Sequence, residues 1–274
     1  MLGKLLKHEF RATARTMWPF YAALLITSLG ANVAVRVMES KKYSDSVLLR
    51  IFSTLVIILF VVALAAVGIM TLVMMVQRFQ KNLLTSEGYL MFTLPVSEHS
   101  LILSKTITAA VWFLATGAAQ VLAMLIMSFR VSYVNKAWED IRQLFSQITS
   151  YYAVNGAAFI LEALAVAFLG CAVTCLMFYA AMALGYGFPT HKGLLSVVFF
   201  FVFLVALQIL GTMGLFASFD GGLLGRGYVG TNTAVEVIRS VHLAMGVAAA
   251  AELVLGGIFY AVTALNLKHR LNLE

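Results

Sequence analysis

The sequence predicts an all-α polytopic membrane protein with six transmembrane helices. The chain of 274 residues is 62% hydrophobic and only 11% charged, and its mean hydropathy is +0.94. Several apolar runs reach or exceed the roughly 20 residues that a helix needs to cross the hydrocarbon core of a bilayer. These runs are continuous, whereas the strands of a membrane barrel are short segments of alternating polarity, so we expect the spans to be helices.

Residues 1–16 predict an amphipathic helix that lies in the membrane interface. Its basic side chains share one helical face: Lys4, His8, Arg11 and Arg15. Leucines and Phe10 occupy the other side, so the basic face is expected to contact water or anionic lipid headgroups. A signal peptide is the alternative. The apolar run that follows is long for one and shows no small-residue cleavage site, so we expect the segment to belong to the mature structure.

The rest of the chain, 17–274, is expected to form one transmembrane domain. The six apolar runs fall at about 17–37, 51–76, 106–129, 156–184, 194–216 and 240–265. Pro19 is expected in the first turn of the first span, where proline is tolerated. Residues 130–154 carry apolar side chains every three or four positions, which predicts a second interfacial helix. The glycine-rich segment 217–239 predicts a loop, or a short re-entrant hairpin whose backbone is covered by protein.

An even number of spans places both termini on one side of the membrane. Ten Lys and Arg residues fall on the side that holds the termini and nine on the other, so the count alone does not decide the orientation. The basic cluster before the first span favours cytoplasmic N- and C-termini, because the first helix usually dominates topology.

The sequence lacks the motifs of an active site or a nucleotide site. It contains no G-x-x-x-x-G-K-[ST], no H-E-x-x-H and no G-x-S-x-G. Cys171 and Cys175 lie four positions apart in an apolar run and are interpreted as packing residues. The net charge of +7 comes from basic residues at the ends of apolar runs, not from the basic and aromatic stripe of a nucleic-acid binder. We therefore expect no enzyme activity, no cofactor or metal, and no nucleic-acid partner.

Four polar side chains are expected inside the membrane: Gln120, Glu162, Gln208 and Glu252. Glu162 lies about two turns into its span, and Glu252 lies near the midplane. An ionised carboxylate costs at least a few kcal/mol there, so each acid is expected to face protein or a wet cavity. Either acid has two interpretations: a contact for substrate or protons, or a protonated acid in an interhelical hydrogen bond with an amide or a hydroxyl.

The segment 77–105 is a long polar-flanked insert between the second and third spans. Its apolar run is too short to cross the membrane, Pro95 ends that run, and Ser97 is placed to cap the next helix. This pattern predicts a short helix or elbow lying against the membrane, with Glu87, Tyr89 and Glu98 available to a soluble partner. A plain interfacial loop is the alternative.

The residues RFQKNLLTSEGYLMFTLPVSEHSLILSK, from Arg78 to Lys105, resemble the region after the second helix of bacterial ABC-2 type permeases. The small six-helix exporter permeases of Gram-positive bacteria are the most similar group. The specific matches are Glu87, Gly88, Tyr89, Thr93, Leu94, Pro95 and Lys105. The amphipathic N-terminus and the six-span layout agree with the same family, and Thr85-Ser86 stands where an acidic residue is frequent.

This resemblance implies a type V exporter-like fold and the role of a permease subunit in an ATP-binding cassette exporter of the bacterial plasma membrane. The insert would be a cytoplasmic coupling helix that contacts a dimer of a separate ATP-binding subunit, which would hold ATP and Mg²⁺. The implied contact residues are Arg78, Lys81, Glu87, Gly88, Tyr89, Leu94 and Pro95. A second copy of the chain or a paralogous permease would complete the transporter, and 217–239 would match a re-entrant region before the last helix.

Two alternatives remain open at this point. One is a secondary carrier driven by protons through Glu162 or Glu252. The other is a membrane subunit that transports nothing and acts as a partner or sensor. The deep acids support the carrier, whereas the insert supports the permease, because a carrier has no need of a docking segment for an ATPase.

Overall fold

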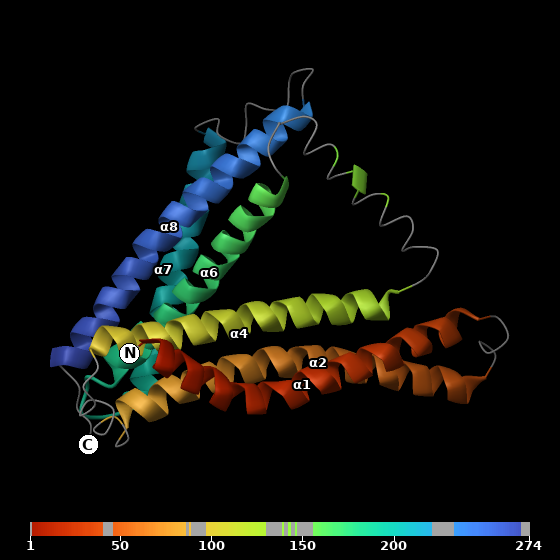
Figure 1. The fold of residues 1–274 in the computed structure, drawn as a ribbon, viewed down its shortest axis with the longest axis horizontal. Helices are drawn as coiled ribbons and strands as arrows, with labels where there is room; N and C mark the ends of the chain where they lie inside the picture. Colours follow the sequence, from red (N-terminus) through yellow and green to blue (C-terminus); the bar gives the residue numbers. More distant parts are fainter. Residues whose placement is uncertain are drawn as a thin grey trace. The chain divides into compact units, whose positions relative to one another are not determined.

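The computed structural model describes residues 2–40, 46–85, 88, 97–129, 139, 142–143, 146, 156–220 and 233–269. These residues contain helices and turns and no strand (Figure 1). Six of the helices are long and apolar enough to cross a membrane, which confirms the predicted all-α architecture. The helical elements are α1 (Leu2–Glu39), α2 (Val47–Phe79), the π-helical turn η1 (Gln80–Leu84), α4 (Glu98–Met127), α6 (Gly156–Gly185), α7 (Lys192–Asp220) and α8 (Thr233–His269).

Helix α1 does not divide where the sequence predicted. A separate interfacial helix over 1–16 and a span beginning near Met17 were expected, but α1 runs unbroken from Leu2 to Glu39, with Pro19 inside it rather than in its first turn. Proline removes one backbone hydrogen bond of a helix. Packing on both sides compensates, because Trp112 of α4 lies 6.4 Å from the ring of Phe10 and 6.1 Å from the ring of Tyr21.

The glycine-rich segment 217–239 is shorter than predicted at both ends. Helix α7 continues to Asp220 and α8 already begins at Thr233, so the expected loop over these flanking residues is wrong. The flanks contain no proline or glycine to stop a helix, whereas the glycines all lie within 221–232. Residues 221–232, and most of the interfacial helix predicted over 130–154, lie outside the described residues.

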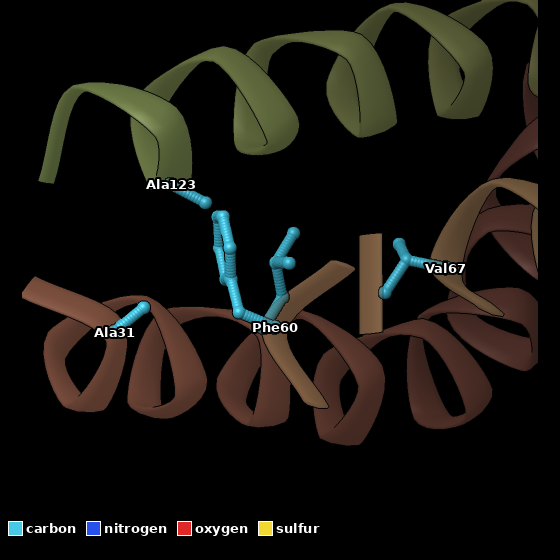
Figure 2. Close-up of a cluster of buried hydrophobic side chains, with 5 residues drawn as sticks. Ala31, Phe60, Val67 and Ala123 are labelled. Carbon is cyan, nitrogen blue, oxygen red and sulfur yellow. The ribbon is translucent and has the colours of Figure 1, made fainter. Parts of the chain in front are cut away.

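The chain divides into two compact units, and each is described by itself. The first comprises Met1–Gln77 and Ile107–Leu144. In it α1, α2 and the later part of α4 share an apolar core, in which the ring of Phe60 reaches from α2 toward Ala123 of α4, beside Ala31 of α1 (Figure 2). Phe60 is only 2% exposed. This apolar cluster joins α1, α2 and α4 to one another.

A chain of hydroxyl groups also connects the three helices of the first unit. The hydroxyl of Tyr21 lies 2.8 Å from that of Thr116, which lies 2.8 Å from that of Thr71. The Thr71 hydroxyl also lies 2.9 Å from the carbonyl oxygen of Val67, one turn earlier in α2. Polar contacts of this kind fix the rotation of helices whose apolar surfaces alone do not distinguish one neighbour from another.

The C-terminal end of α4 is closed by side chains from α1. The amide nitrogen of Asn32 donates to the carbonyl oxygens of Ile126, Met127 and Phe129 at 2.9–3.0 Å. The guanidinium group of Arg36 also donates to the Phe129 carbonyl, at 3.0 Å. These donors bond to carbonyl groups at and just beyond the end of α4, where the regular backbone hydrogen bonds of a helix run out. The Ile126 carbonyl also accepts the N–H of Phe129 at 3.2 Å.

The second unit comprises Arg78–Thr106 and Phe145–Glu274. Here α6 packs against both α7 and α8 (Figure 1). Glycines permit the close approach of these helices. A Cβ atom at Gly185 would lie 2.5 Å from the amide nitrogen of Ser196 in α7, and one at Gly256 would lie 3.2 Å from Cγ2 of Val173 in α6. This unit also contains residues Arg78–Thr106, which include nearly all of the insert 77–105.

Candidate functional site

The insert begins as an ordered continuation of α2. The span was expected to end near residue 76, but the helix continues to Phe79 and then widens into the π-helical turn Gln80–Leu84. Phe79, Leu83 and Leu84 are buried, at 0%, 0% and 3% exposure. The first residues of the insert are therefore packed against the protein.

The structure places three of the seven predicted coupling residues. Arg78 is partly buried at the end of α2, and Lys81 is exposed on η1. Gly88 is buried, and its N–H donates to the carbonyl oxygen of Thr85 at 2.8 Å, which closes a turn. The other four predicted coupling residues lie outside the described part of the chain: Glu87, Tyr89, Leu94 and Pro95.

The beginning of the insert is fixed to α6 by two consecutive residues. The rings of Phe79 and Tyr179 stack with centroids 3.9 Å apart and planes 8° from parallel. The side-chain amide of Gln80 donates a hydrogen bond to the hydroxyl of Tyr186, in the turn after α6. Both tyrosines were unremarkable in the sequence, because an aromatic residue at a membrane boundary has many possible roles.

The end of the insert is capped as predicted and is fixed to α8. The amide of Ser100 donates to the side-chain oxygen of Ser97 at 3.4 Å, and α4 begins at Glu98, which confirms Ser97 as the cap. His99 Nδ1 and the Tyr260 hydroxyl share a hydrogen bond of 2.6 Å, and the two rings stack with centroids 5.9 Å apart. Both ends of the insert therefore hold specific side-chain contacts with the last helices.

Lys105, the final position of the motif, is a buried residue. It is 4% exposed, and its neighbours Ser104 and Thr106 are 2% and 5% exposed. The hydroxyl groups of both neighbours bond to carbonyl groups of α4 itself, Leu101 and Ile102. The ammonium group of Lys105 is thus held within the protein and is not presented to a soluble partner.

Two of the predicted intramembrane polar residues are amides. The Gln120 amide nitrogen donates to the Leu64 carbonyl of α2 at 3.0 Å, and a Cβ atom at Gly68 would lie 3.3 Å from that nitrogen. Gln120 therefore joins α4 to α2 through a backbone carbonyl, and among the described residues it makes no hydrogen bond with Glu162 or Glu252. Gln208 is exposed on α7, and its backbone carbonyl accepts a hydrogen bond from Thr212.

Glu162 is paired with a histidine rather than with an amide. Its Oε2 lies 2.8 Å from Nδ1 of His242, and the two side chains are 34% and 31% exposed. The ring of Phe159 packs edge-on against the His242 ring, with centroids 5.2 Å apart. Glu162 and His242 both fall near the beginning of predicted spans, 156–184 and 240–265, and this shared position was the available signal for the pair.

Glu252 lies against a glycine of α6. A Cβ atom at Gly170 would lie 2.9 Å from Oε1 of Glu252. The other carboxyl oxygen, Oε2, is buried and has no hydrogen-bond partner among the residues that the structure describes. The expected interhelical contact is therefore present as close packing, while a bond to a hydroxyl or an amide is not formed in that part of the chain.

Groups of metal-ligand type do not cluster in the described residues. No set of three His, Cys, Asp or Glu side chains there is close enough to hold an ion. Cys171 and Cys175 are both free thiols on α6, the first partly buried and the second buried. Their arrangement is that of packing residues on one helix.

Comparison of the chain with protein-family models, with curated proteins and with solved structures gives no match. The family resemblance therefore depends on the insert motif and the six-helix layout. Of the residues that match the family specifically, the structure describes Gly88 and Lys105, and both are buried. These two observations are the basis of the functional proposal.

Proposed function

We propose that this chain is the permease subunit of an ATP-binding cassette exporter in the bacterial plasma membrane. The observation that carries the proposal is the insert, whose residues from Arg78 to Lys105 resemble the coupling segment of ABC-2 permeases. The resemblance falls at the expected place, between the second and third of six candidate spans. No phosphate loop is needed in such a chain, because ATP and Mg²⁺ bind to the partner subunit.

The described ends of the insert support a docking element. Leu83 and Leu84 are buried, Gly88 closes a turn on Thr85, and Ser97 caps the helix that follows. A segment whose two ends are ordered loses less conformational entropy on binding than a loose loop does. The central residues Glu87 to Pro95 are the ones we assign to contact with the ATPase.

The mechanism follows from this assignment. Two ATPase subunits close on ATP, and the insert of each permease follows the surface on which it is seated. That displacement is passed to the membrane helices and opens a path where two permeases meet, either two copies of this chain or this chain and a paralogue. In this scheme the insert and both termini are cytoplasmic.

The first experiment tests the partner. The chain is co-expressed with a candidate ATPase subunit that carries a phosphate loop and is encoded beside it. We expect a stable complex in detergent and ATP hydrolysis that depends on the chain. Failure of the neighbouring ATPase to bind, with the chain folded and monodisperse, would exclude the proposal.

A charge reversal tests the contact surface. Glu87→Arg is expected to reduce ATPase association or turnover by about tenfold or more, because a like or unpaired charge at a docking surface costs on the order of 1.4 kcal/mol or more. Glu139→Arg is the matched control, since Glu139 is exposed and lies in the predicted segment on the opposite side of the membrane. Equal behaviour of the two variants would remove Glu87 from the contact.

The Glu162–His242 pair supports a second candidate, a proton-coupled carrier. An acid and a histidine at hydrogen-bond distance can exchange a proton, and intramembrane groups of this kind occur in proton relays. The chain alone in vesicles, with a pH-sensitive dye inside, distinguishes the two functions. Proton uptake that is lost in Glu162→Gln, without any ATPase present, would favour the carrier over the permease.

A further inference from the structure

We infer that the two described ends of the insert drive α6 and α8 directly, through three side-chain contacts that join these ends to the two helices. The inference rests on the proposed function and assigns positioning roles to residues outside the motif. The contacts are Phe79 with Tyr179, Gln80 with Tyr186 and His99 with Tyr260. All six residues lie in the second compact unit.

The first contact is the stiffest of the three. Phe79 and Tyr179 are 0% and 1% exposed, and their stacked rings have centroids 3.9 Å apart. Close-packed protein interiors have low compressibility and transmit strain, so a displacement of Phe79 presses directly on α6. A flexible side chain in either position would absorb part of that displacement.

The second contact fixes the direction of the first. Gln80 follows Phe79 and bonds to Tyr186, whose own N–H donates to the carbonyl oxygen of Met182 at 2.9 Å. Tyr186 is therefore held by the end of α6 while it accepts the Gln80 amide. A ring contact and a hydrogen bond from adjacent residues prevent the insert from rotating about a single point.

The third contact joins the other end of the insert to α8. His99 lies in the first turn of α4, and its ring both bonds to and stacks on Tyr260. The described ends of the insert are thus fixed to different helices, Phe79 and Gln80 to α6 and His99 to α8. We therefore expect a displacement of the insert to reach both helices.

Helices α6 and α8 are themselves closely packed, so the two anchors act on one assembly. Gly170 and Gly256 bring the helices to distances at which an added Cβ atom would lie 2.9 Å from Glu252 Oε1 and 3.2 Å from Val173 Cγ2. Interfaces of this kind shift as a body rather than deform continuously. The three contacts therefore convert motion of the insert into motion of the α6–α8 pair.

Removal of single hydroxyl groups tests the anchors. Tyr186→Phe and Tyr260→Phe are expected to bind the ATPase with unchanged affinity, but to lower permease-dependent ATP hydrolysis by about fivefold for each lost hydrogen bond. Tyr21→Phe is the matched control, since it also removes a hydroxyl that is hydrogen-bonded, at 2.8 Å to Thr116, but in the first unit. Its hydrolysis rate is expected to stay within about twofold of the wild type.

A cross-link provides the rescue. In a Cys171→Ala, Cys175→Ala background, His99→Cys with Tyr260→Cys removes the third contact and is expected to lower hydrolysis. Joining the two new thiols with bismaleimidoethane re-creates a rigid connection and is expected to restore the rate of the background. A residue needed only for folding would not be rescued by a covalent link added after purification.

The outcomes separate the inference from the proposed function. If the wild-type chain forms no complex with the ATPase, the proposed function and the inference are both overturned. If the wild-type complex hydrolyses ATP and the tyrosine variants keep its rate, the inference alone is overturned. The same holds if the cross-link leaves the rate low or lowers it further, because the insert would then need to move relative to α8.

Discussion

Gly185, at the end of α6, lies directly against Ser196 of α7. A Cβ atom at position 185 would lie 2.5 Å from the Ser196 amide nitrogen and 2.7 Å from its Cα atom. Both atoms are backbone, so no rotamer change relieves the contact. Ser196 is 9% exposed. Tyr186, an anchor of the insert, follows Gly185 directly, so the same close approach places the end of α6 where Gln80 can reach it.

Gly185→Ala is expected to lower the stability of the chain by about 1–3 kcal/mol, because the backbone of α6 or α7 must shift to admit the methyl group. The measurement is the midpoint of thermal unfolding in detergent, followed by circular dichroism or size-exclusion chromatography. Gly193→Ala is the control, since a Cβ atom there meets nothing within 4 Å. If both variants unfold at the wild-type temperature, the helices are not in this contact.

Asn32→Asp is expected to destabilise the end of α4 more than Asn32→Ala does. The alanine variant loses hydrogen bonds to the last carbonyl groups, at a cost of about 1–2 kcal/mol, whereas the aspartate also places a negative charge at the negative end of the helix dipole. Hydrogen exchange over residues 124–129 measures the effect. Asn266→Ala is a suitable comparison, because among the described residues the Asn266 amide donates to Val262 of its own helix. Equal exchange in both Asn32 variants would argue against the cap.

Thr116→Val is expected to break the hydroxyl chain of the first unit without changing the volume of the side chain much. The substitution leaves the Tyr21 and Thr71 hydroxyls without their shared partner, at a cost of about 1–2 kcal/mol. Unfolding in detergent reports the loss. Thr27→Val provides the reference, since the Thr27 hydroxyl donates, within the described part of the chain, to carbonyl groups of α1 itself. A cost no larger than that of the reference would mean that the chain of hydroxyls contributes nothing.

The Glu162–His242 pair is expected to couple α6 to α8 by about 0.5–1.5 kcal/mol, the range that interhelical polar contacts reach in membrane proteins. Both side chains are about one-third exposed, so screening by solvent holds the value below that of a buried pair. The measurement is a double-mutant cycle of Glu162→Ala and His242→Ala on unfolding. Strict additivity of the two single variants would show that the pair makes no contribution.

Gly170→Ala is expected to destabilise the contact of α6 with α8, and a second change, Glu252→Ala, is expected to recover part of the loss. The added methyl group would lie 2.9 Å from Glu252 Oε1, and the shorter side chain removes that clash. Gly257→Ala, where a Cβ atom meets nothing within 4 Å, shows the effect of an alanine on α8 without a clash. If Glu252→Ala makes Gly170→Ala worse, the two residues are not neighbours in the folded chain.

The helices were predictable because hydrophobic runs define membrane spans, and the start of α4 was predictable because Ser97 has the chemistry of a helix cap. The continuous α1 was not predictable. A proline ends a helix when nothing else supports it, and the support here comes from Trp112, which is distant in sequence. Local signals therefore placed the cap correctly and misjudged Pro19.

The contacts of the insert depend on side chains that no local pattern singles out. Tyr179, Tyr186 and Tyr260 each look like an ordinary aromatic residue of a span or its boundary. His242 falls within the predicted span 240–265, but its pairing with Glu162 was not predictable, because pairing depends on the rotation of two helices about their axes. The sequence specifies which faces are apolar, and only the packed structure specifies which polar residues meet.

The anchors of the insert are made late in synthesis. Gln80 and Tyr186 are separated by 106 positions, and His99 and Tyr260 by 161. A nascent chain therefore releases the insert from the ribosome well before the tyrosines that hold it. The first anchor can form only after the end of α6 is made, and the second only after α8 is inserted. A product that stops before α8 has at most the α6 anchor, so cellular quality control can recognise incomplete chains by an insert that is open to proteases.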